Sequence, residues 1–445
     1  MTFASAAWPA SASATAAPRA LRTHAESPLF TLALALFTVL LLTVSPLALG
    51  ALGFDYTDTG GNILTKFHPA TLYLCFLFVL AAAATGDPLG ATVQGFRTTP
   101  SSLLLVGATL VAVVHAAMIS KLPFTPLIET FIPAPLLLIL LTGLKERRGR
   151  TLAGLIHTIL FANAVLALGE YLTGWRLTPF VIDGESLDYE WRATALLGHP
   201  LANAMITGTY IILLAVGGGR DLPWLLRAVS FTTCLAAMTA FGGRGALVLV
   251  LAVLALLAAR KALSVLNGAA LDTRAMMASI LAVPVAGAGL LYLAHTGFFD
   301  RLVERFVDDT GSAQTRLDMT QLFSHIPLQE LLFGPDPRVL TTWQDMLGLQ
   351  RGIESFWISM TLSYGLLVAG LVFLGLLAHC WTVARRCRPG AAWALVYFIA
   401  VASTSLSLAG KSGVLTIATL LPLVLLRRPP VPSPGAPLTY RARLR

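Results

Sequence analysis

Long apolar runs separated by short polar connections cover most of this sequence. A helix that crosses the hydrocarbon core of a bilayer needs ~20 predominantly apolar residues. Such runs begin near Leu29, Pro69, Ser102, Leu127, Thr151, Ala193, Trp224, Arg244, Met276, Ser355, Ala391 and Ser412. The pattern therefore predicts an all-α polytopic membrane protein with about twelve transmembrane helices.

The polar connections indicate an orientation. If the N-terminus is cytoplasmic, the larger share of the 31 lysines and arginines falls in cytoplasmic connections and tails, as the positive-inside rule requires. We therefore expect a multi-pass protein of the bacterial inner membrane with both termini in the cytoplasm. The expected division is a disordered tail over 1–28, a membrane domain over 29–427 and a basic tail over 428–445.

Two connections on the predicted outer side are longer or more charged than a simple turn requires. Residues 173–192 are acidic, and residues 297–353 form the longest polar stretch between apolar runs. Within the long loop, the apolar spacing over 298–307 predicts an amphipathic helix at the membrane surface, and a second helix is expected from Thr315 to His325. Gly334 to Pro337 then predicts a turn. A long structured loop of this kind is usually functional.

Composition agrees with the hydropathy pattern. The chain is 56% hydrophobic and 12% charged, with a mean hydropathy of +0.76, whereas a soluble domain has roughly 25% charged residues. The net charge of +9 is divided among the connections, so the continuous basic face of a nucleic-acid-binding protein is not expected. The positions of the four cysteines suggest neither a structural disulfide nor a metal cluster.

The candidate chemistry consists of carboxylates and guanidinium groups. The sequence has no phosphate loop, no Gly-x-Ser-x-Gly and no His-Glu-x-x-His motif, so we expect no metal and no cofactor. Arg192, Arg244 and Arg316 fall on the predicted outer side, where the charge rule disfavours them. Several arginines meeting at one membrane face would bind a diphosphate. The alternative is that each arginine is an interfacial anchor or a salt-bridge partner.

Glu354 is the candidate general base. It opens an apolar run, and a carboxylate at a lipid boundary should have a raised pKa, although the residue type is also common in the first turn of any helix. His199 and Asn203 lie just inside the sixth run and are candidates for the lining of a cavity, as are Glu170 and Glu129. For Glu129 and His115, packing is the favoured interpretation, and His325 is expected at the surface.

Three segments resemble the O-antigen ligase and polymerase (Wzy/WaaL-like) superfamily. Residues 192–204, from Arg192 through Gly198 and His199 to Asn203, are similar to its Arg-plus-Gly-plus-Asn segment. Residues 243–247 are similar to its Ser-Arg-Gly segment, with Gly243 in place of Ser. The stretch from Gly311 to Glu354 looks like its long periplasmic loop. The ligase branch has His where this chain has Glu354, eleven residues before Gly365, and this departure favours the exopolysaccharide-polymerase (VpsF-like) branch.

The resemblance implies a metal-independent, GT-C-like membrane glycosyltransferase that uses undecaprenyl-diphosphate-linked oligosaccharides at the periplasmic face. On this basis Arg192, Arg244 and Arg316 would bind the donor diphosphate and Glu354 would accept the proton of the acceptor hydroxyl. Arg351 and Arg338 would bind saccharide or hold the long loop closed, and His199 and Asn203 would also bind the substrate. A chain-length regulator and a flippase of the same pathway are the implied partners, beside the lipid bilayer.

Three other functions remain open from the sequence: a ligase, a transporter or flippase, and a structural membrane protein of a polysaccharide-export complex. A ligase of the same fold would move glycan to an acceptor such as a lipid core. A transporter or flippase would carry it across the membrane, although transporters often contain internal repeats and broken helices at mid-membrane, and no clear repeat relates the two halves of this chain.

Overall fold

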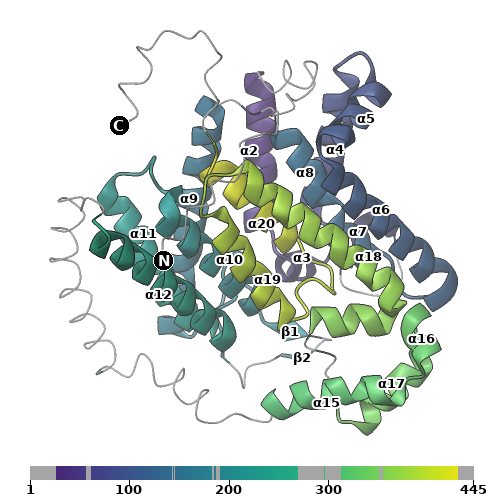
Figure 1. Ribbon diagram of the computed structural model, residues 1–445. Helices are drawn as coiled ribbons and strands as arrows, with labels where there is room; N and C mark the ends of the chain where they lie inside the picture. Colours follow the sequence, from purple (N-terminus) through teal and green to yellow (C-terminus); the bar gives the residue numbers. More distant parts are fainter. Residues whose placement is uncertain are drawn as a thin grey trace.

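The computed structural model describes residues 27–56, 62–142, 144, 146–182, 185–186, 191–268, 295, 312–349, 353 and 355–428. For residues 181–182, 185–186 and 312–318 it describes the backbone alone. The described part is predominantly helical, and its helices cross one another in a single bundle (Figure 1).

The first half of the chain forms a series of helices that begin, in most cases, at a proline. Proline suits the first helical turn, because its missing N–H would have no partner there. In chain order these helices are α2 (Pro28–Thr43), α3 (Pro46–Ala51), η1 (Ile63–Lys66), α4 (Pro69–Ala83), α5 (Pro88–Thr98), α6 (Pro100–His115), η2 (Ala116–Ser120), α7 (Thr125–Phe131), α8 (Pro133–Leu141) and α9 (Glu146–Thr173).

The rest of the chain begins with a small hairpin and continues with α-helices of 6 to 31 residues. The hairpin pairs β1 (Val181–Ile182) with β2 (Glu185–Ser186) in antiparallel register, Val181 opposite Ser186. The helices that follow are α10 (Pro200–Leu213), η3 (Leu214–Gly218), α11 (Trp224–Phe241), α12 (Arg244–Leu266), α15 (Ser312–His325), α16 (Leu328–Phe333), α17 (Pro337–Met346), α18 (Phe356–Arg386), α19 (Ala391–Ser403) and α20 (Val414–Leu425).

Six of these helices are long and apolar enough to cross a membrane: Pro100–Ser120, Glu146–Thr173, Pro200–Gly218, Trp224–Phe241, Arg244–Leu266 and Phe356–Arg386. A seventh span is possible if α4 and α5, which meet at 112°, are counted as one broken span. This architecture is consistent with an all-α, multi-pass membrane protein.

The expected number of about twelve spans is not confirmed. Eleven of the twelve predicted apolar runs coincide with helices, and the run near Met276 lies outside the described residues. However, α2, α7 with α8, α19 and α20 contain 10–17 residues each. At 1.5 Å per residue, the 12 residues of α20 extend about 18 Å, which is less than the ~30 Å hydrocarbon core.

Predictions for the loop regions had mixed outcomes. The helix expected from Thr315 to His325 is confirmed as α15, and the turn at Gly334 is confirmed between α16 and α17. His325 is exposed, as expected, and stacks on Trp343. The amphipathic helix predicted over 298–307 lies outside the described residues.

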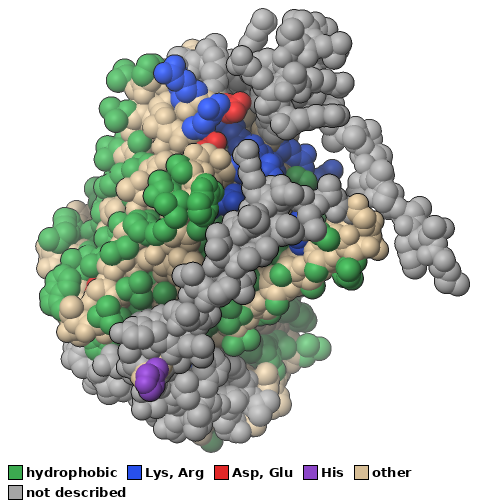
Figure 2. All heavy atoms as spheres, turned by 90° about the vertical axis from the view of Figure 1, so that its left-hand side faces the viewer, with side chains coloured by type: hydrophobic (Ala, Val, Ile, Leu, Met, Phe, Trp, Pro, Cys, Tyr) green, Lys and Arg blue, Asp and Glu red, His purple; other side chains and the backbone are tan. Residues whose placement is uncertain are grey.

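The core of the bundle surrounds α10, which packs against α11, α12, α19 and α20. Large apolar side chains are exposed on the outside of the bundle, among them Leu29, Phe76, Leu251 and Leu374. Figure 2 shows hydrophobic side chains spread over one such face. An apolar exterior of this extent is unusual for a monomeric soluble protein and suits contact with lipid.

The two ends of the bundle differ in charge. The basic end consists of the described residues 97–100, 142, 144, 146–150, 385–393 and 426–428 and the last turns of α12. Figure 2 shows Lys and Arg side chains gathered at this end. There Arg386 donates hydrogen bonds to Thr98 O (2.7 Å) and Thr142 Oγ1 (2.5 Å), and Arg428 donates to Cys387 O (2.6 Å). The loop end consists of the described residues 44–56, 62–68, 174–182, 185–186, 191–199, 242–244 and 404–413, with α15 to α17. The sequence-predicted site residues that have described side chains lie at the loop end.

Candidate functional site

The segment 191–199 is fixed at the loop end by a buried carboxylate. Glu170, in the last turn of α9, is fully buried and accepts the backbone N–H groups of Leu177 (2.8 Å), Thr194 (2.8 Å) and Ala195 (3.0 Å). A buried carboxylate is stabilised when several amides donate to it. Glu170, which the sequence suggested as a possible cavity residue, therefore holds the loop in place.

A pair of asparagines completes this support. Asn163 of α9 donates to Asn203 Oδ1 (3.0 Å) and accepts from Leu196 N (2.9 Å), while Asn203 donates to Thr194 O (2.7 Å). Both asparagines are buried. Asn203 was expected to bind substrate, but its amide is occupied by the protein itself, so the structure places it as a support of the segment.

Two residues of the segment adopt left-handed backbone angles. Ala195 has a φ of 41°, and Gly198 has a φ of 75°. A Cβ on Gly198 would lie 2.5 Å from Ser45 Oγ, so this position requires glycine for space as well as for conformation. A non-glycine residue such as Ala195 in this region costs ~1–3 kcal/mol and persists only where its surroundings hold it. Here Glu170 supplies that restraint.

Arg192 and Arg244 are brought to the same part of the loop end. The N–H of Ala193, next to Arg192, donates to Ala240 O (3.0 Å) in the last turn of α11. Gly242 (φ 65°) reverses the chain, and Arg244 opens α12. Both arginine side chains are half-buried.

A third arginine, Arg176, joins Arg192. Its Nε donates to Arg192 O (3.1 Å), and its guanidinium lies 5.2 Å from the centre of the Trp191 ring. Sequence reasoning counted Arg176 among the outer-side cations but did not single it out. The sequence feature that could have identified Arg176 is its position in the same connection as Arg192, between α9 and α10.

The glycines beside Arg244 have different environments. A Cβ on Gly243 would approach the Cβ of Ala204 to 2.9 Å, whereas a Cβ on Gly245 would meet nothing within 4 Å. Tyr397 of α19 closes the contact by donating to Ala204 O (3.3 Å) and lying 3.2 Å from Ala246 O. Gly243 therefore serves the packing of α12 on α10, and the open side of the turn lies at Gly245.

His199 is the N-cap of α10. Its Nδ1 accepts the N–H of Leu201 (3.2 Å), and its ring lies edge-on to Phe180 with centroids 5.6 Å apart. Burial, and secondly the positive charge of Arg192, lower the pKa of His199 to about 4. The imidazole is therefore neutral at pH 7, which suits an acceptor of the capping hydrogen bond.

The other predicted site residues are not brought to this place. Glu354 and Arg351 lie outside the described residues, and so does the side chain of Arg316, whose backbone is part of α15. Arg338 is exposed in the first turn of α17.

A second cationic group at the loop end was not predicted as a site. Lys411 donates to Tyr56 O (2.6 Å) and lies 5.0 Å from the centre of its ring, and Lys66 donates to Asp55 O (2.5 Å). Burial, and secondly the charge of Lys66, lower the pKa of Lys411. The two lysines donate to the carbonyls of the adjacent residues Asp55 and Tyr56, although Lys66 and Lys411 are far apart in the sequence. Only the fold brings them together.

This lysine pair is connected to the arginine segment through residues 44–47. His68 Nε2 lies 2.8 Å from Val44 O, and Gly198 packs on Ser45. Glu129 is buried beneath the lysines and accepts from His68 N (3.1 Å) and Thr71 Oγ1 (2.6 Å), so the favoured packing interpretation of Glu129 is confirmed.

The long loop is attached to the bundle at a break in α18. Gly365 (φ 77°, ψ 156°) interrupts the helix, and a Cβ there would clash with the backbone of Phe333 and Gly334. His115 is buried, which agrees with the packing interpretation, and its Nε2 lies 2.8 Å from Phe333 O. The absence of a side chain at Gly365, a position that the family resemblance identified, thus allows the end of α16 to pack against α18.

A comparison of this chain with protein-family models, with curated proteins and with solved structures finds no match. Among the described residues, no group of three or more His, Cys, Asp or Glu is placed to hold a metal ion. The candidate site is therefore a cationic region at the loop end, built from Arg176, Arg192 and Arg244, with Lys66 and Lys411 beside it.

Proposed function

We propose that this protein is a membrane glycosyltransferase that joins undecaprenyl-diphosphate-linked oligosaccharide units into a polysaccharide. The loop end would face the periplasm and the basic end the cytoplasm, because the positive-inside rule assigns the cation-rich end to the cytoplasm. The twelve-span, GT-C-like fold expected from the family resemblance is part of this proposal.

The observation that carries the proposal is the construction of the segment 191–199. A buried carboxylate and two buried amides fix its backbone, and that backbone positions Arg192 beside the turn that carries Arg244. Guanidinium groups match the oxygens of a diphosphate, and preorganised cations stabilise charge that develops on a leaving group. A segment fixed in this way suits such a role better than a mobile interfacial anchor.

The proposed reaction is the attack of an acceptor hydroxyl oxygen on C1 of the donor sugar. The new C1–O bond forms as the bond from C1 to the phosphate oxygen breaks, and undecaprenyl diphosphate leaves with the bonding electron pair. Arg192 and Arg244 would stabilise the negative charge on the leaving diphosphate. The acceptor proton passes to a general base, a role that the family resemblance assigns to Glu354.

The test is chain extension in cells that depend on this protein for their polysaccharide. Arg192→Ala and Arg244→Ala should each stop extension, and single repeat units should accumulate on the lipid carrier. The matched control is Arg97→Ala, an exposed arginine at the basic end, which should extend chains normally.

Two results would overturn the proposal. Long polymer that forms but stays on the lipid carrier would identify a ligase. Normal polymer in both arginine variants, with the proteins inserted in the membrane, would remove the role of the arginines.

A further inference from the structure

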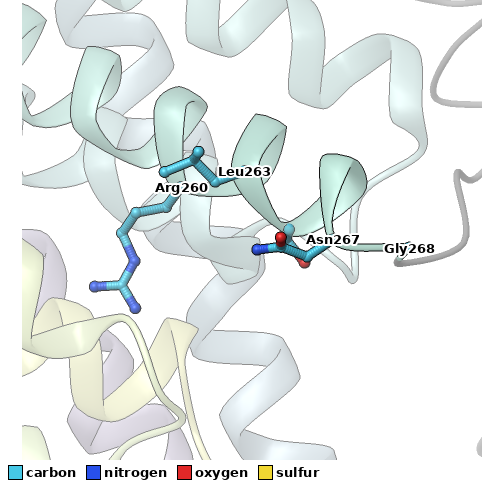
Figure 3. A pocket seen from close by; sticks show the side chains of 5 residues that line it. Arg260, Leu263, Asn267 and Gly268 are labelled. Carbon is cyan, nitrogen blue, oxygen red and sulfur yellow. The ribbon is translucent and has the colours of Figure 1, made fainter. Parts of the chain in front are cut away.

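A pocket of about 610 Å³ lies at the basic end of α12, away from the candidate site. It is lined by Arg260, Leu263, Ser264, Asn267 and Gly268 (Figure 3). Sixteen residues separate Arg260 from Arg244 along α12, which corresponds to about 24 Å. The pocket is shallow and open, and its lining residues all belong to the end of α12 and the two residues that follow it.

The polar side chains of the pocket share one face of the helix. Arg260, Ser264 and Asn267 follow the i, i+4, i+7 spacing that aligns side chains. Figure 3 shows the Arg260 and Asn267 side chains on the same side of α12. Gly268, with a φ of 86°, follows the end of α12, and a Cβ there would meet nothing within 4 Å.

A neighbouring helix orients the cation. The guanidinium carbon of Arg260 lies 5.7 Å from the centre of the Trp393 ring, in the first turn of α19. Within the described residues, no carboxylate forms an ion pair with Arg260. The first turn of α19 also presents its positive dipole end here, which counteracts the unfavourable effect of the carbonyl end of α12 on an anion.

The pocket has apolar side chains beside its polar ones. Leu263, which lines it, is 58% exposed, and Leu266, in the last turn of α12, is 81% exposed. A guanidinium, a hydroxyl and an amide beside an apolar wall match an amphiphile with an anionic head.

We propose that this pocket binds a phosphate group, presented by the head of an anionic membrane lipid. In the orientation proposed above, this end of α12 faces the cytoplasm, where basic side chains next to a membrane helix commonly hold anionic headgroups. Arg260 would contact the phosphate oxygens, Ser264 and Asn267 would donate to the headgroup, and the exposed leucines would contact the acyl chains.

The test is native mass spectrometry of the purified full chain with added phosphatidylglycerol or phosphatidylcholine. The wild type should retain phosphatidylglycerol in preference to phosphatidylcholine. Arg260→Ala should weaken the retention of phosphatidylglycerol about tenfold, the loss expected from one charge-assisted hydrogen-bonded contact. Arg260→Lys, which keeps the charge and loses the planar fork, should show an intermediate loss.

Lys261→Ala is the matched control, because Lys261 carries the same charge on the same turn and does not line the pocket. It should bind phosphatidylglycerol as the wild type does. An equal loss in Lys261→Ala, or no loss in Arg260→Ala, would overturn the site. Displacement of the lipid by glycerol phosphate at the same concentration would show that a soluble phosphate is the ligand and would overturn the lipid as its source.

Discussion

Arg386 and Arg428 at the basic end and Arg192 at the loop end are used in opposite ways. At the basic end, the side chains of Arg386 and Arg428 donate to backbone carbonyls and so tie the ends of helices together. At the loop end, the backbone next to Arg192 is held by Glu170 and Asn163. The first arrangement uses the cation for stability, whereas the second uses other groups to position a cation. Stability and activity should therefore respond differently to substitution at the two ends.

The largest effect on stability is expected at Glu170. Glu170→Ala leaves three backbone N–H groups without their acceptor, two of which, in Thr194 and Ala195, are buried. Each unsatisfied buried group costs ~1–3 kcal/mol. Thermal unfolding in detergent should show a loss of about 3 kcal/mol or more. Glu146→Ala, at an exposed i,i+4 ion pair with Arg150, is the control and should change stability by less than about 1 kcal/mol. Similar losses in the two variants would contradict the assigned role of Glu170.

Arg386→Ala tests the opposite end. It removes hydrogen bonds to Thr98 O and Thr142 Oγ1, so a loss of about 1–3 kcal/mol in unfolding free energy is expected. The protein that remains folded should extend polysaccharide chains as well as the wild type. Arg244→Ala should show the reverse, with stability nearly unchanged and extension lost. If both variants lose the same property, the contrast between the ends is wrong.

The glycines beside Arg244 provide a smaller and better matched comparison. Gly243→Ala places a Cβ 2.9 Å from Ala204 and should destabilise the protein by about 1–3 kcal/mol through overpacking. Gly245→Ala meets open space within α12 and should be neutral or stabilising by up to about 1 kcal/mol. Thermal unfolding of both variants checks the pair, and a larger loss at Gly245 would contradict the packing of α12 on α10.

The smallest expected effect is a pH dependence at His199. Its folded pKa of about 4 lies below the ordinary value of 6.5, so the unfolded state takes up the proton first as pH falls. The stability that His199 contributes is therefore present above pH 6.5 and is lost between pH 6.5 and 4. His199→Asn keeps an N-cap acceptor and should reduce this acid sensitivity. An unchanged pH profile in the variant would assign the sensitivity elsewhere.

Hydropathy predicted the helical class and the location of most helices, because burial of apolar side chains and satisfaction of backbone groups dominate in lipid. It did not predict helix lengths. The run that begins near Ala391 was predicted to span the membrane, yet α19 ends at Ser403 after 13 residues. Thr404 and Ser405 follow the last helical residue, and hydropathy averaged along the chain does not show where a helix ends.

The candidate site was predicted only in part. Arg192 and Arg244 were selected because they oppose the charge rule, and the structure places both at the loop end. Asn203 was assigned to substrate because nothing in the sequence indicates that Asn163, 40 positions away, is its partner. Glu170 likewise acts on residues 24 and 25 positions away, so its role depends on a loop conformation that no local pattern encodes.

The most direct test of the central claim is the binding of a polyprenyl diphosphate to the purified protein. The account predicts that Arg192→Ala and Arg244→Ala each raise the dissociation constant about tenfold or more, because each removes a charge-assisted contact to the diphosphate, while Arg97→Ala leaves it unchanged. Equal dissociation constants in the wild type and in both loop-end variants would contradict the account.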